Sequence, residues 1–199
     1  MQSHVEAEHE SAPNLSNDKA PGTPPALPLG TALVVTIVGL AIIIGFIAIG
    51  TLLHVVPLYA GFLFLWYWTS VTHSSPAALA PAMIGSLVGA GLSYMLQTGT
   101  ATGNAPLALG ALGLMIVALF LVIAGRLPTF CNAATMLYVT VFNAPILQGG
   151  EDFRQVILAT VLGIVWFGAT IMGAVWLAAR VARSRTAENP IAETVPVPA

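Results

Sequence analysis

Apolar residues run almost without interruption along most of this chain, and the few breaks between them are prolines, glycines and small polar clusters. The stretch from Ala20 to Gly125 contains no Asp, Glu, Lys or Arg, and two further charge-free stretches cover Leu127–Gly150 and Gln155–Ala179. A folded surface in water needs charged side chains to stay solvated. The pattern therefore predicts an all-α integral membrane protein.

The breaks divide this apolar region into separate spans. A bilayer core of about 30 Å needs about 20 apolar residues per helix, and Pro, Gly and polar clusters set the boundaries. Six spans result, the second of which is short enough to be tilted or partly re-entrant. They cover Leu29–Leu53, Pro57–Thr72, Ala77–Leu96, Pro106–Gly125, Pro128–Leu147 and Val156–Ala179. We expect a membrane domain over 29–182, between an acidic, Pro-rich disordered tail at 1–28 and a disordered tail at 183–199.

The few basic residues predict the orientation of these spans. Basic residues near span ends favour the cytoplasmic side. With six spans, both termini lie on one side, and a cytoplasmic placement leaves only Arg154 outside. The basic residues placed inside are Lys19, Arg126, Arg180, Arg183 and Arg185. We therefore expect both termini in the cytoplasm.

The second and fifth spans share a spaced pattern of proline, tyrosine and threonine, followed by a closing proline. The pattern reads Pro57, Tyr67, Thr69, Pro76 in one span and Pro128, Tyr138, Thr140, Pro145 in the other. Each copy lies between two long apolar segments, which predicts a 3+3 duplication with repeats at about 29–96 and 106–180. A repeat with an odd number of spans places its copies in opposite orientations. Such inverted repeats are typical of transporters and channels, whose path lies between the halves.

Span five is the most polar of the six. On an ideal helix, Thr129, Asn132, Thr140 and Asn143 fall within an arc of about 80°. Asparagine is costly in hydrocarbon unless it is paired or wetted. The four residues are therefore candidates for lining a substrate path, and interhelical hydrogen bonding is the alternative.

Three residues of the repeated pattern extend the list of path candidates. Tyr67 and Tyr138 are symmetric partners near the expected crossing of the halves, and Thr69 follows Tyr67 on the second span. His54 and His73 lie at span ends on opposite sides of the membrane. Histidine changes charge near neutral pH, which makes both residues candidates for pH sensing, and ordinary solvation is the alternative.

Composition excludes several classes of function. The chain has a formal net charge of −2 and no basic patch for nucleic acid, and its single cysteine, Cys131, excludes an internal disulfide and a multi-cysteine metal site. No Asp or Glu falls inside a span, which argues against a carboxylate proton relay or sodium site. Nucleotide-binding, zinc-protease and nucleophile motifs are also missing from the sequence. We expect neither enzymatic activity nor a cofactor or metal.

Several segments resemble a known family. They are AGFLFLWY at Ala60–Tyr67, GSLVG at Gly85–Gly89, RLPTF at Arg126–Phe130 and WLA at Trp176–Ala178. Over about residues 30–180 the chain resembles the small bacterial inner-membrane proteins grouped as domain of unknown function 1097. The resemblance implies a bacterial inner-membrane location and a transport-related role.

Together these features predict a small helical channel or facilitative transporter. We expect a homo-oligomer in the lipid bilayer that conducts a small neutral or weakly polar solute near spans two and five. The alternative is a non-conducting accessory subunit of a larger membrane complex. A stable homo-oligomer would favour the channel, and co-purification with a larger partner would favour the accessory subunit.

Overall fold

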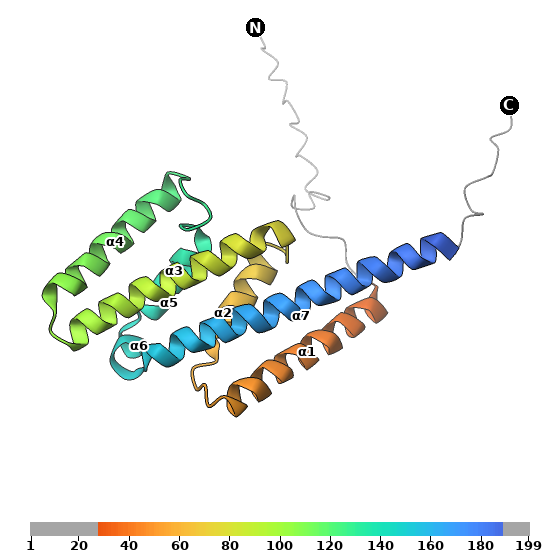
Figure 1. The fold of residues 1–199 in the computed structure, drawn as a ribbon, viewed down its shortest axis with the longest axis horizontal. Helices are drawn as coiled ribbons and strands as arrows, with labels where there is room; N and C mark the ends of the chain where they lie inside the picture. Colours follow the sequence, from red (N-terminus) through yellow and green to blue (C-terminus); the bar gives the residue numbers. More distant parts are fainter. Residues whose placement is uncertain (1–27, 189–199) are drawn as a thin grey trace, which may run out of the picture. The chain divides into compact units, whose positions relative to one another are not determined.

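A computed structural model describes residues 28–188. Most of the two predicted tails, 1–27 of the first and 189–199 of the second, lies outside this range. The described residues form helices joined by turns, with no strand among them. The helices are α1 (Leu29–Leu52), α2 (Tyr59–Trp66), the π-helix η1 (Tyr67–Val71), α3 (Pro76–Ala101), α4 (Ala105–Ile123), α5 (Ala133–Phe142), α6 (Pro145–Gly150) and α7 (Phe153–Glu188). Figure 1 shows them along the chain. The all-helical prediction is confirmed.

Four helices are long and apolar enough to cross a membrane, namely α1, α3, α4 and the part of α7 from Phe153 to Val181. They correspond to the first, third, fourth and sixth predicted spans. The second and fifth spans are shorter than predicted, because α2 with η1 and α5 each cover only part of the expected segment. Helix α7 also continues to Glu188, beyond the expected end at Ala179 and into the predicted C-terminal tail.

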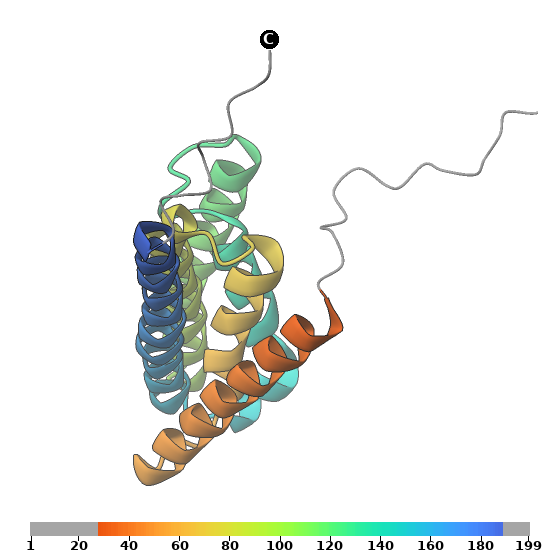
Figure 2. The same ribbon diagram turned by 90° about the vertical axis from the view of Figure 1, so that its right-hand side faces the viewer.

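The chain divides into two units, Met1–Val38 and Gly39–Ala199, and α1 begins in the first and ends in the second. In the first unit, the described part of α1 exposes its large apolar side chains. In the second unit, α3 packs against α4, α5 and α7, while α2 packs against α7. Figure 2 shows α3 and α7 side by side, with the short helices α2 and α5 on the same side of this pair.

Glycines allow the short helices to approach the long ones closely. A Cβ atom at Gly163 of α7 would collide with the backbone of Gly61 in α2. A Cβ atom at Gly89 of α3 would lie 2.6 Å from the Thr135 carbonyl oxygen and 2.7 Å from the Tyr138 Cβ, both in α5. Only a hydrogen at these positions permits such close contact. The two crossings hold α2 against α7 and α5 against α3.

Helices α1 and α4 end in the same way. His54 and Gly125 both have a positive φ, at 57° and 63°, which is the left-handed conformation common just beyond a helix C-terminus. After α1, the Val55 amide donates to the Gly50 carbonyl at 2.9 Å, and after α4 the Arg126 amide donates to the Leu121 carbonyl at 2.9 Å. Each motif precedes a proline, Pro57 or Pro128, by the same number of residues.

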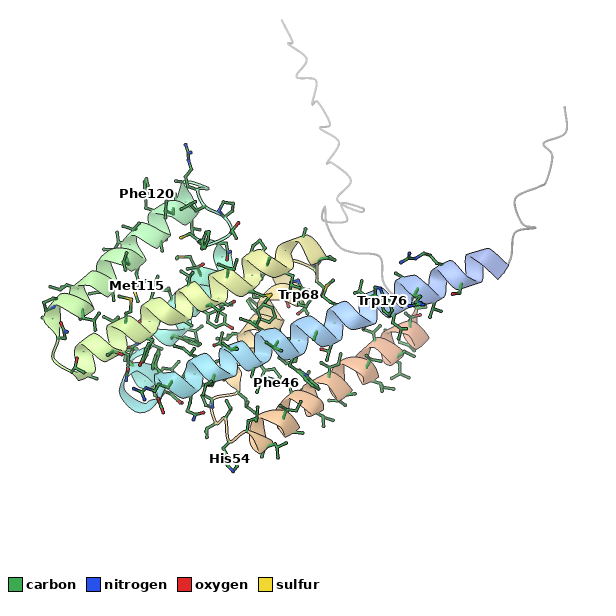
Figure 3. The ribbon with its side chains drawn as sticks, in the orientation of Figure 1. Phe46, His54, Trp68, Met115, Phe120 and Trp176 are labelled. Atoms are coloured by element: carbon green, nitrogen blue, oxygen red, sulfur yellow. The ribbon has the colours of Figure 1, made fainter. Side chains whose placement is uncertain are left out.

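Aromatic side chains fill the interior of the second unit, whereas its outer helix α4 exposes large apolar side chains. Seven large aromatic side chains are fully buried, namely Phe46, Phe64, Trp68, Tyr138, Phe142, Phe153 and Phe167. In contrast, Ile116 and Phe120 on α4 are 69% and 65% exposed, and Figure 3 shows Phe120 pointing away from the neighbouring helices. A large exposed apolar face is stable in lipid, which agrees with an integral membrane protein.

Candidate functional site

Asn132 is the residue at which α5 begins. Its Oδ1 accepts hydrogen bonds from the amides of Ala134 at 2.9 Å and Thr135 at 3.4 Å. Its Nδ2 donates to the carbonyl of Pro81 in α3 at 2.8 Å and to the carbonyl of Pro128 at 2.9 Å. The Thr135 hydroxyl accepts from the backbone amide of Asn132, which completes a capping box. Asn132 therefore fixes both the start of α5 and its position on α3.

Asn143 lies at the other end of α5, where the helix stops. Its Nδ2 donates to the Ser93 hydroxyl of α3 at 3.1 Å and to the Val139 carbonyl at 2.7 Å. The Gln148 Nε2 donates to the Asn143 Oδ1 at 3.2 Å and to the Phe142 carbonyl at 2.8 Å. The side chains of Asn143, Ser93 and Gln148 thus form a connected, uncharged hydrogen-bond group between α3, α5 and α6.

Tyr138 lies between these two asparagines and is fully buried. Its hydroxyl donates to the Ala60 carbonyl of α2 at 2.7 Å. The side chains of Ser86 in α3 and Thr160 in α7 lie next to the same hydroxyl, although only the bond to Ala60 has hydrogen-bonding geometry. Four helices therefore contribute a polar group to one point in the interior.

Tyr67 makes the reciprocal approach from the first short helix. Its hydroxyl lies at the backbone of Ala134, in the first turn of α5, as Tyr138 reaches Ala60 in the first turn of α2. The end of α2 therefore meets the start of α5, and the later part of α5 meets the start of α2. The two short helices run in opposite directions.

The predicted polar face of span five is wrong in its geometry. Helix α5 covers only Ala133–Phe142, so Asn132 and Asn143 cap its ends and Thr129 lies in the turn before it. Thr140 is exposed and does not join the two asparagines. Thr69 of η1 donates its hydroxyl to the Leu65 carbonyl, one turn earlier in α2, at 2.7 Å. Of the seven path candidates, the structure brings Asn132, Tyr138 and Asn143 together along α3.

The two histidines lie apart from this row. His54 and His73 are exposed, and both have a positive φ, at 57° and 52°. Figure 3 shows His54 projecting away from the helices at the turn after α1. Histidine tolerates the left-handed conformation better than most residues, which accounts for His54 at a helix end. Their role in pH sensing stays a prediction.

Sequence reasoning missed four buried hydroxyls, those of Ser93, Thr135, Ser86 and Thr160. The last two, Ser86 and Thr160, could have been found. Each stands three residues before a glycine at which a short helix crosses, Gly89 in α3 and Gly163 in α7. A serine or threonine three residues before such a glycine lies on the same helix face. This spacing of hydroxyl and glycine in the sequence could have indicated that both hydroxyls face a helix crossing.

We name the interior groups the polar row: Asn132, Ser86, Tyr138, Thr160, Ser93 and Asn143. Along α3 it extends from Pro81 to Ser93, a rise of about 18 Å at 1.5 Å per residue. It contains hydroxyl and amide groups and no carboxylate, ammonium or guanidinium. Among the described residues, no three His, Cys, Asp or Glu side chains are grouped closely enough to hold a metal ion. The polar row can therefore offer hydrogen bonds but no charge to a ligand.

Comparison with protein-family models found no match for this chain, and neither curated proteins nor solved structures gave one.

Proposed function

We propose that this protein is a facilitator that conducts a small neutral solute between two inverted halves. The first half comprises α1, α2 with η1, and α3, and the second comprises α4, α5 and α7. The observation that carries the proposal is that each short helix packs on a long helix of the other half, α2 on α7 and α5 on α3. Short helices held between long ones at a repeat interface are typical of transporter sites.

Several features support the duplication. His54 and Gly125 are the residues of positive φ that follow α1 and α4. Each precedes the proline and the tyrosine of its copy of the pattern by the same number of residues. The hydroxyl–glycine pairs, Ser86 with Gly89 and Thr160 with Gly163, each lie on a closing helix where a short helix crosses it. The opposite directions of α2 and α5 are those expected of inverted copies. These features together support a duplication of three spans.

The short helices fit a six-crossing topology. At 1.5 Å per residue, α2 with η1 extends about 20 Å and α5 about 15 Å, which is less than a bilayer core of about 30 Å. Irregular backbone at membrane depth is tolerated where protein surrounds it or where it lines a cavity. The turn before α5 satisfies this condition, because Asn132 binds the Pro128 carbonyl and the α5 amides.

The chemistry of the polar row supports a neutral solute. An ion would lose its hydration shell without gaining a charged partner, which is strongly unfavourable. A neutral solute would lose only hydrogen bonds to water, which hydroxyl and amide groups can replace. Passive conduction needs no coupling group, and the predicted spans carry no carboxylate.

Reconstituted protein provides the functional test. We expect proteoliposomes to equilibrate urea, acetamide or glycerol faster than empty liposomes in stopped-flow light scattering, with no gain for formate or methylammonium. Asn143→Ala should slow the conducted solute by about tenfold, since one hydrogen bond in the path is lost. Asn104→Ala is the matched control, because Asn104 caps α4 at an exposed position.

Two outcomes would contradict the proposal. Folded protein that speeds none of these solutes would favour the accessory-subunit alternative. Unchanged flux in Asn143→Ala, together with a lower unfolding temperature, would show that Asn143 serves only to join helices.

A further inference from the structure

Ser86 is the one group of the polar row whose hydrogen bonding is incomplete. Its side chain is fully buried, and its Oγ has no hydrogen-bond partner among the described residues. The other buried hydroxyls of the row are bonded, since Thr160 donates to Val156 and Ser93 accepts from Asn143. A buried hydroxyl without a partner is destabilising. Its retention at the crossing of four helices calls for an explanation.

The surroundings of Ser86 define what could bind there. Ser86 and Thr160 both lie beside the Tyr138 hydroxyl, and the Ala60 carbonyl accepts from Tyr138. Ser86 can donate to a carbonyl oxygen, whereas the Ala60 carbonyl can only accept. A ligand that meets both must carry an acceptor and a donor. The glycine crossings at Gly89 and Gly163 hold the backbones close together, so this ligand must be small.

We propose that Ser86, Tyr138, Thr160 and the Ala60 carbonyl form a central binding site for a small neutral solute with both a donor and an acceptor. The inference deepens the proposed function and rests on it. The solute takes the hydrogen bond that Ser86 lacks, and the Tyr138 hydroxyl leaves the Ala60 carbonyl as the solute enters. Small amides and polyols belong to this class, and ions do not.

The first test is flux through Ser86→Ala. We expect the variant to conduct acetamide about tenfold more slowly than the wild type, because one solute hydrogen bond is lost. Thr100→Ala is the matched control, since Thr100 is an exposed hydroxyl near the end of the same helix. Equal flux in Ser86→Ala and wild type, both folded, would overturn the assignment of Ser86.

A second test does not depend on flux. In a Cys131→Ala background, Ser86→Cys should react with a small neutral methanethiosulfonate reagent, and excess acetamide should slow the reaction. Ala118→Cys, a buried position on α4 outside the polar row, should stay unreactive. No reaction at Ser86→Cys would overturn the site. Reaction with acetamide protection in a protein that conducts nothing would support the site and contradict the proposed function, which separates the two failures.

Discussion

Gly163→Ala is expected to lower the free energy of unfolding by about 3 kcal/mol, since overpacking a close-packed crossing carries a cost of this order. The added methyl group would collide with the Gly61 backbone, whose carbonyl carbon and oxygen would each lie 2.9 Å away. Backbone atoms cannot rotate aside as a flexible side chain can. Unfolding of the purified protein by SDS in mixed micelles measures the change.

Gly168→Ala on the same helix is the matched control. The nearest atom to an added Cβ there is the Leu79 Cδ1, at 3.9 Å, which is ordinary van der Waals contact. Alanine also has a higher helix propensity than glycine. Gly168→Ala should therefore be neutral or slightly stabilising. Equal stability in the two variants would mean that α2 and α7 do not cross at Gly61 and Gly163.

Asn132→Ala is expected to destabilise the protein by about 2 kcal/mol, more than an ordinary helix cap. Loss of an N-cap typically costs about 1 kcal/mol. Here the substitution also removes the hydrogen bond to the Pro81 carbonyl of α3, and an unpaired polar group in the interior adds about 1 kcal/mol or more. The same SDS titration measures this change.

Asn104→Ala isolates the capping contribution. Asn104 accepts from the Leu107 amide at 3.1 Å at the start of α4, and it is exposed. Its loss should cost about 1 kcal/mol. If the two asparagine variants lose equal stability, the contact between Asn132 and α3 contributes nothing, and the position assigned to α5 is wrong.

The four long helices were predictable because their length and lack of charge are direct consequences of the bilayer. The short helices were predictable only in part, since the second span was short enough to be partly re-entrant but the fifth was expected at full length. Hydropathy marks Pro57–Thr72 and Pro128–Leu147 as apolar, but it does not register that Asn132 starts a helix through local hydrogen bonds. Hydropathy also does not show that the expected fifth span is broken after Phe142 and continues as a separate short helix, α6. Capping and helix breaks depend on single side chains within an apolar stretch.

The site was predictable only in part. Asn132 and Asn143 stood out because amides are rare and costly in hydrocarbon. The same periodicity added Thr140, which is exposed, because it assumed one continuous helix. Ser86 and Thr160 escaped notice because single hydroxyls are common in membrane helices, where they bond to their own backbone. Their importance arises from tertiary contacts with Tyr138.

Inverted halves require α2 and α5 to cross the membrane in opposite directions, which cysteine labelling tests directly. Single cysteines at the exposed positions Val56, Ala77, Ala124 and Gly149 would be introduced into a Cys131→Ala background. An impermeant maleimide applied to intact cells should label Val56→Cys and Gly149→Cys, and reach Ala77→Cys and Ala124→Cys only after permeabilisation. Labelling of Val56→Cys and Ala77→Cys from the same side would show that α2 does not cross, and would contradict the inverted halves.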